Sequence, residues 1–109
     1  MIFTAHESSP IISARHFPTS RQFDLIPLVA DSLLNYERAT VVSLCPTDDW
    51  LFAYFPGVNH AGIGCLWHRE AQLDTWTQKE SWSYPIGGGV VTAAWACHHR
   101  EVSICFRKR

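Results

Sequence analysis

The sequence has no long apolar run, no excess of basic residues and no leader-like beginning. No window approaches the roughly 18 consecutive apolar residues that a membrane-spanning helix requires, so we expect no membrane partner. The first ten residues lack a cationic segment followed by a long apolar one, which argues against a secretory signal. A formal net charge of −1 argues against direct nucleic-acid binding, which leaves a basic footprint. The basic run 107–109 is interpreted as a solvated tail.

The cysteine spacing gives neither a C-x2-C zinc pair nor a compact disulfide framework. We therefore expect reduced, mostly buried thiols and an intracellular protein. The one local cluster with metal-binding chemistry is Cys97-His98-His99, with Cys105 further along. Adjacent histidines on a strand–turn–strand segment point in opposite directions, so a polar turn is favoured there over a zinc site. The remaining cysteines are Cys45 and Cys65.

Apolar and aromatic side chains are abundant. The chain is 47% hydrophobic and 13% aromatic, with five tryptophans, and only 17% of its residues are charged. This composition is typical of strands and interfaces and differs from that of disordered segments. A length of 109 residues allows one compact domain or a piece of a larger one.

Residues 1–38 are predicted to form an irregular lead-in. A short β-branched patch at Ile11-Ile12 indicates one strand. A short helix is predicted over 25–37, because its apolar residues fall near helical spacing and Pro27 can occupy a first helical turn. A loop followed by a strand is the alternative for this segment. The apolar residues that carry the helical pattern are Leu25, Leu28, Val29, Leu33 and Tyr36.

Residues 39–109 are predicted to form antiparallel strands. Their β-branched and apolar runs are separated by turn residues such as Pro46-Thr-Asp-Asp49. The run Trp50–Phe55 shows no polar alternation, so both faces of this strand are expected to be buried. The expected strands cover 39–44, 50–55, 63–67, 74–82, 90–95 and 102–106.

The β region also begins to repeat itself. Thr40–Leu44 aligns with Gly89–Ala93, and Trp50–Phe52 aligns with Val102–Ile104. The resulting period of roughly 50 residues is somewhat longer than the usual propeller blade. The second half of the chain is therefore expected to rebuild the structure that begins at residue 39.

Four short strands, the third ending in Leu66-Trp67 before charged residues, resemble one blade of a WD-type β-propeller. The sequence departs from that pattern at His68, where an acidic residue is usual, and at Asp49, where glycine is usual. The resemblance implies an all-β fold of about one and a half blades. The first blade would cover 39–84 and a partial second blade 89–106.

A closer resemblance combines four segments and covers about residues 39–95. The segments are Asp49–Pro56, Gly62–Trp67, the tryptophan-bearing stretch 74–82 and Gly88–Trp95. Together they look like the N-terminal WD-repeat region of the fungal form of Mediator complex subunit 16. That family implies a non-enzymatic, nuclear coactivator scaffold in the Mediator tail module, linking transcription activators to RNA polymerase II. The implied partners are other tail subunits and activators, with no cofactor, metal, small-molecule substrate or catalytic residue.

For several short motifs, a structural interpretation is favoured over a catalytic or ligand-binding one. Gly87-Gly-Gly89 is not followed by Gly-Lys-Ser/Thr or a helix, so a turn is favoured over a phosphate loop. Asp48 and Asp49 are interpreted as turn residues that bond local N–H groups. A Cys–His nucleophile needs a held base and oxyanion donors, neither of which the sequence supplies. Most tryptophans are expected in the core; Trp76 and Trp82, on a more polar outer strand, are candidates for a partner surface.

The length of the chain sets the main difficulty. A propeller needs at least about four blades, on the order of 160 residues, to close and remove its edges. The chain is therefore expected to be a truncated product, to assemble with other chains, or to form a small independent β domain. The alternative functions are a WD-like interaction module outside Mediator and an independent β domain with a Cys/His metal site. No partner-binding residue is assigned.

Overall fold

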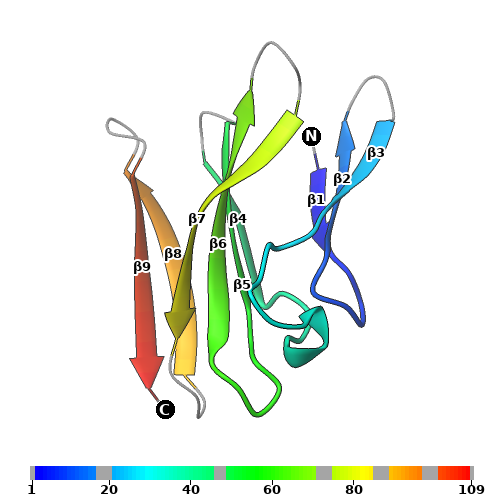
Figure 1. The fold of residues 1–109 in the computed structure, drawn as a ribbon. Helices are drawn as coiled ribbons and strands as arrows, with labels where there is room; N and C mark the ends of the chain where they lie inside the picture. Colours follow the sequence, from blue (N-terminus) through cyan, green and yellow to red (C-terminus); the bar gives the residue numbers. More distant parts are fainter. Residues whose placement is uncertain are drawn as a thin grey trace.

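The computed structural model describes residues 2–16, 21–45, 49–70, 75–84, 89–96 and 101–108. In these ranges the regular elements are β-strands and one short 3-10 helix, η1 (Leu33–Asn35) (Figure 1). The strands are β1 (Ile2–Ala5), β2 (Ile12–His16), β3 (Arg21–Leu25), β4 (Val41–Leu44), β5 (Trp50–Phe55), β6 (Gly62–Glu70), β7 (Thr75–Tyr84), β8 (Gly89–Ala96) and β9 (Glu101–Lys108). The all-β prediction is confirmed.

The strands form three antiparallel sheets in the order of the sequence. An N-terminal sheet has the order β1-β2-β3, a central sheet β4-β5-β6-β7, and a hairpin β8-β9. Each strand therefore pairs with its neighbour in the chain, as short connections favour. The described strands close neither a barrel nor a propeller ring.

The prediction for residues 1–38 is wrong. In place of an irregular lead-in, β1, β2 and β3 form a paired sheet, and the strand expected at Ile11-Ile12 is β2. The helix predicted over 25–37 is absent; only the single turn η1 forms, capped by Ser32, whose Oγ accepts a bond of 3.2 Å from Leu34 N–H.

The apolar residues with helical spacing do not share one face of a helix. Leu25 ends β3, and Val29 packs against the core from an extended connector. Tyr36 forms a β-bridge with Gly57, while the side chain of Leu28 is 71% exposed. The spacing thus arose from separate contacts along an irregular segment.

The predicted hairpin over 39–55 is confirmed. Leu44 is paired with Leu51, and the N–H of Cys45 donates to the carbonyl of Trp50 at 2.8 Å, closing the end of the ladder. The turn residues 46–48 lie outside the described ranges. The remaining expected strands are also present, as β6, β7, β8 and β9.

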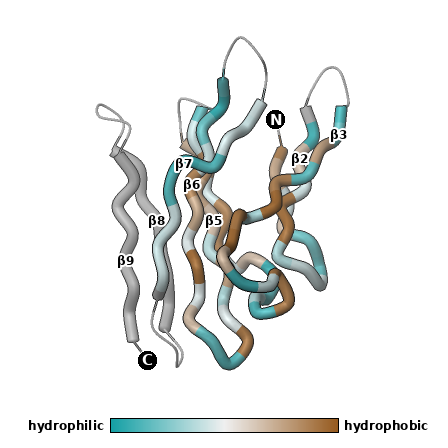
Figure 2. The backbone as a smooth tube through the Cα atoms, in the orientation of Figure 1, coloured by the Kyte–Doolittle hydropathy of each residue, from teal (hydrophilic) through white to brown (hydrophobic). Residues whose placement is uncertain are grey.

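Strand β5 is buried on both faces, as its unbroken apolar run predicts. Leu51 and Phe52 are neighbours that point to opposite faces of the sheet, and both are 0% exposed. Leu51, Ala53 and Phe55 belong to a core cluster shared with the N-terminal sheet. Figure 2 shows hydrophobic positions along the facing strands of these two sheets. The opposite face of β5 looks toward the side where the β8–β9 hairpin lies (Figure 1).

The three sheets come together at their first strands. β1 lies beside β4, and β4 lies beside β8. The later strands of each sheet follow outward from this row. The central sheet is consequently sandwiched, with the N-terminal sheet on one side and the hairpin on the other (Figure 1).

Candidate functional site

A bulge in β7 sends its two tryptophans to opposite faces of the central sheet. Leu66 is paired with Glu80 and Trp67 with Gln78, so Lys79 is an extra residue without a partner in the ladder. Trp76 and Trp82 are separated by an even number of positions and would share one face without this bulge. Instead, Trp76 packs against Phe3 of the N-terminal sheet, with ring centroids 5.1 Å apart. Trp82 packs against Phe52 on the other face, with ring centroids 6.3 Å apart.

These contacts change the interpretation of Trp76 and Trp82 as a partner surface. Both do lie on the outermost strand of the central sheet, as expected. Both are also partly buried, however, and Trp76 packs against the core cluster. Neither indole stands free in solvent, so neither is available as a whole to a partner.

A polar cluster of Asp31, Asn35, Tyr36 and His60 joins the connector before β4 to the loop between β5 and β6. The carboxylate of Asp31 accepts hydrogen bonds from Asn35 Nδ2 at 2.9 Å and from the Tyr36 hydroxyl at 3.3 Å. His60 Nε2 lies 3.3 Å from the same carboxylate, and the His60 ring meets Tyr36 edge to face. A pocket of about 320 Å³ beside the cluster also carries Ser81 and Ser83. No sequence motif marks this cluster, because its members come from two separate connecting segments.

The protonation states of Asp31 and Tyr36 suit the hydrogen bond between them. The hydrogen bond from Asn35 lowers the pKa of Asp31, with a smaller contribution from Tyr36, so Asp31 is a carboxylate near neutral pH. Burial, and then the charge of Asp31, raises the pKa of Tyr36, which stays a donor. His60 Nδ1 lies 2.8 Å from the carbonyl of Ala61, and Nε2 lies 3.3 Å from Asp31, so both ring nitrogens have local partners. The arrangement clamps two loops together.

The predicted acidic turn is described only at Asp49, since Asp48 lies outside the described ranges. The carbonyl of Asp49 accepts a bond of 2.8 Å from Arg69 N–H, which extends the β5–β6 pairing by one link. The carboxylate of Asp49 lies 3.9 Å from His68 Nε2, and the His68 ring sits against Trp50 with centroids 4.2 Å apart. This corner therefore links the turn to the end of β6.

The thiols that can be placed are buried, and the structure brings no metal site together among the described residues. Cys45 and Cys65 are buried thiols, and burial raises the pKa of Cys65 to about 12, so it is a poor nucleophile. No group of three or more His, Cys, Asp or Glu side chains in the described ranges could hold a metal ion. The candidate cluster Cys97-His98-His99 lies outside those ranges, and only the backbone of Cys105, in β9, is described. Gly87 and Gly88 also lie outside them, and Gly89 begins β8.

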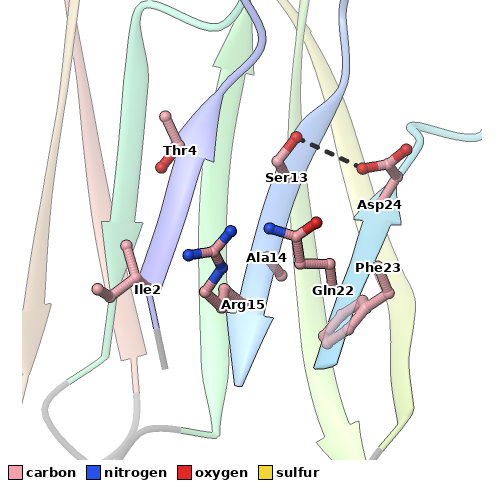
Figure 3. A pocket seen from close by; sticks show the side chains of 8 residues that line it. All are labelled: Ile2, Thr4, Ser13, Ala14, Arg15, Gln22, Phe23 and Asp24. Atoms are coloured by element: carbon pink, nitrogen blue, oxygen red, sulfur yellow. Dashed lines mark hydrogen bonds between the residues drawn. The ribbon is translucent and has the colours of Figure 1, made fainter. Parts of the chain in front are cut away.

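A shallow hollow of about 270 Å³ lies on the outer face of the N-terminal sheet (Figure 3). Cross-strand partners meet there: Ser13 Oγ donates to Asp24 Oδ1 at 3.4 Å, and Arg15 Nε lies 2.9 Å from the amide oxygen of Gln22 when that oxygen faces the guanidinium. This face was missed because no sheet was expected before residue 39.

Within the described ranges, no helix has the length and apolar character needed to cross a membrane. The chain matches no protein-family model, no curated protein and no solved structure in comparisons with each.

Proposed function

We propose that this chain is a non-enzymatic protein-interaction scaffold built from consecutive sheets that resemble the blades of a WD-type β-propeller, and that it serves in the nuclear Mediator tail module. The observation that carries the architectural part is the row of first strands, in which β1 lies beside β4 and β4 beside β8. In a propeller the first strand of each blade lines the axis and later strands lead outward. The burial of both faces of β5 supports the same arrangement.

The chemistry of the described polar groups supports a scaffold over an enzyme. The Asp31 carboxylate is held by Asn35 and Tyr36, and the Cys65 thiol is kept protonated by burial. Enzymes more often poise such groups near the working pH and aim them at a shared reaction centre. The assignment to Mediator rests on the sequence resemblance over residues 39–95, with tail subunits and activators as the partners it implies.

Co-expression tests the proposal directly. The tagged chain should co-purify in stoichiometric amount with recombinant tail-module subunits of a fungal Mediator. A matched control is Ala53→Asp, which places a charge at a fully buried core position and should abolish co-purification by unfolding the central sheet. A folded wild-type chain that co-purifies with none of the subunits would contradict the Mediator assignment.

A further inference from the structure

The N-terminal sheet and the central sheet share one core, but they differ in the faces that point away from it. The central sheet is apolar on both sides, as Leu51 and Phe52 show. The N-terminal sheet is apolar only on its inner face, where Ile12, Ala14 and Leu25 are buried. The residues that the pairing register places on its outer face are Ile2, Thr4, Ser13, Arg15, Gln22 and Asp24 (Figure 3).

The polar groups of this outer face are paired within the sheet. Ser13 bonds Asp24, and Arg15 bonds Gln22 when the amide oxygen of Gln22 faces the guanidinium, each across the β2–β3 ladder. Such pairs keep their contact with water and cost little on a solvated face. A further sheet packed over them would desolvate the Arg15 guanidinium and the Asp24 carboxylate, for which the described residues of this face supply no charged partner, and this is strongly unfavourable.

We infer that the N-terminal sheet is a cap: the stack of blade-like sheets is open on this side, and the outer face of β1–β3 meets water. Repeat arrays end in units with a polar outer face, because such a unit terminates the continuous core. A closed ring would instead bury this face between two blades. The inference rests on the blade-like part of the proposed function and adds that any further blade-like sheet joins from the β8–β9 side.

A second copy of the chain is a poor occupant for the same face. Stable dimers bury roughly 1,200–2,000 Å² in total around an apolar centre. Among the described residues of this face the one large apolar side chain is Ile2, which is 55% exposed and lies on the edge strand, as the first residue of β1. Arg15 lies on the middle strand β2, and Gln22 and Asp24 lie on the edge strand β3. Among its described residues, the face therefore has no apolar centre for a dimer.

Thiol labelling of the folded chain tests the cap. Thr4→Cys places a thiol on the outer face, and Ala14→Cys places one on the inner face of the same sheet. Native Cys65 is a buried reference in every sample. Maleimide labelling is located by peptide mass, with sedimentation velocity on the same sample to give the assembly state.

We expect the thiol introduced by Thr4→Cys to label in the folded chain at a rate within about tenfold of its rate in urea. The thiol introduced by Ala14→Cys should label at least about 100-fold more slowly in the folded chain than in urea. If Ala14→Cys does not fold, Cys65 supplies the protected reference. Protection of the Thr4→Cys thiol in a folded sample would overturn the cap, whether another copy or another sheet covers it. Labelling does not depend on Mediator. A chain that labels as expected but binds no tail subunit would therefore support the cap and contradict the Mediator assignment.

Discussion

Phe3 and Trp76 meet edge to face, with ring centroids 5.1 Å apart and planes at 83°. One ring comes from the first strand of the N-terminal sheet and the other from the last strand of the central sheet. Trp76 reaches this side of the central sheet because the bulge at Lys79 sets its face. The pair therefore joins the first strand of one sheet to the last strand of the other.

Replacing either ring should separate the sheets at that point. Phe3→Leu and Trp76→Leu are each expected to lower the free energy of unfolding by about 2 kcal/mol, because both rings are only partly buried. The double variant should reveal a coupling of about 0.5–1.5 kcal/mol in a double-mutant cycle measured by urea unfolding. Leu34→Ala, at an 88% exposed position, is the control and should change the free energy by less than about 0.5 kcal/mol. Strict additivity would show that the rings do not interact.

Deleting Lys79 should be far more harmful than substituting it. The deletion removes the bulge, so one half of β7 must turn over and place Trp76 and Trp82 on one face of the sheet. We expect the free energy of unfolding to fall by at least about 3 kcal/mol, or unfolding to lose its cooperativity. Tryptophan fluorescence during urea unfolding measures both. Lys79→Ala keeps the residue count and breaks only the exposed 3.7 Å pair with Glu70, so it should cost less than about 0.5 kcal/mol. Equal effects of the two changes would refute the role of the bulge.

Gly62 provides space for the ring of Tyr54. A Cβ atom at position 62 would lie 2.8 Å from two ring carbons of Tyr54, much closer than ordinary contact. Gly62→Ala is therefore expected to lower the free energy of unfolding by about 1–3 kcal/mol, because the added methyl group overpacks this site. In a Tyr54→Leu background the same change should cost much less, since the smaller side chain vacates that space. An undiminished cost in that background would point to backbone strain instead of the ring.

The Asp31 clamp should weaken in acid. The folded-state pKa of Asp31 lies below its ordinary value of 3.8, so its contribution is present above that value and is lost as the pH falls through the lowered folded pKa. Asp31→Asn should thus be less stable than wild type at pH 7, and the difference should narrow as the pH is lowered below about 4. Guanidinium unfolding at pH 7 and pH 3 measures this. A stability difference between wild type and Asp31→Asn that stays constant with pH would mean that the charge of Asp31 does not contribute to stability.

The sequence was most informative where turn residues bracket apolar runs. The strand pair 39–44 and 50–55 could be predicted because a Pro-Thr-Asp-Asp turn separates two strand-like runs, and the lack of alternation in Trp50–Phe55 correctly indicated burial on both faces. These are local properties. They do not depend on where the rest of the chain lies.

The N-terminal sheet was missed because its strands are short and their periodicity is weak. In β3, Arg21–Leu25, the inward residues are too few to show alternation, and a helical spacing happened to begin at Leu25. The position of the bulge at Lys79 also leaves no sequence pattern, since an extra residue in a polar edge strand looks like any other. The cluster of Asp31 with His60 depends on how two loops meet, which tertiary structure alone decides.

One consequence of the strand order concerns the sequence of folding events. Every strand pair is a hairpin between chain neighbours, so each ladder closes a short loop and can form early. The bonds that tie the connector after β3 to the central sheet span a much longer loop: the side-chain amide of Gln78 accepts from Leu28 N–H at 2.8 Å and donates to its carbonyl at 3.4 Å. We therefore expect the amide of Leu28 to gain protection from hydrogen exchange later than the amides of β5 and β6, making closure of the connector a late step in folding.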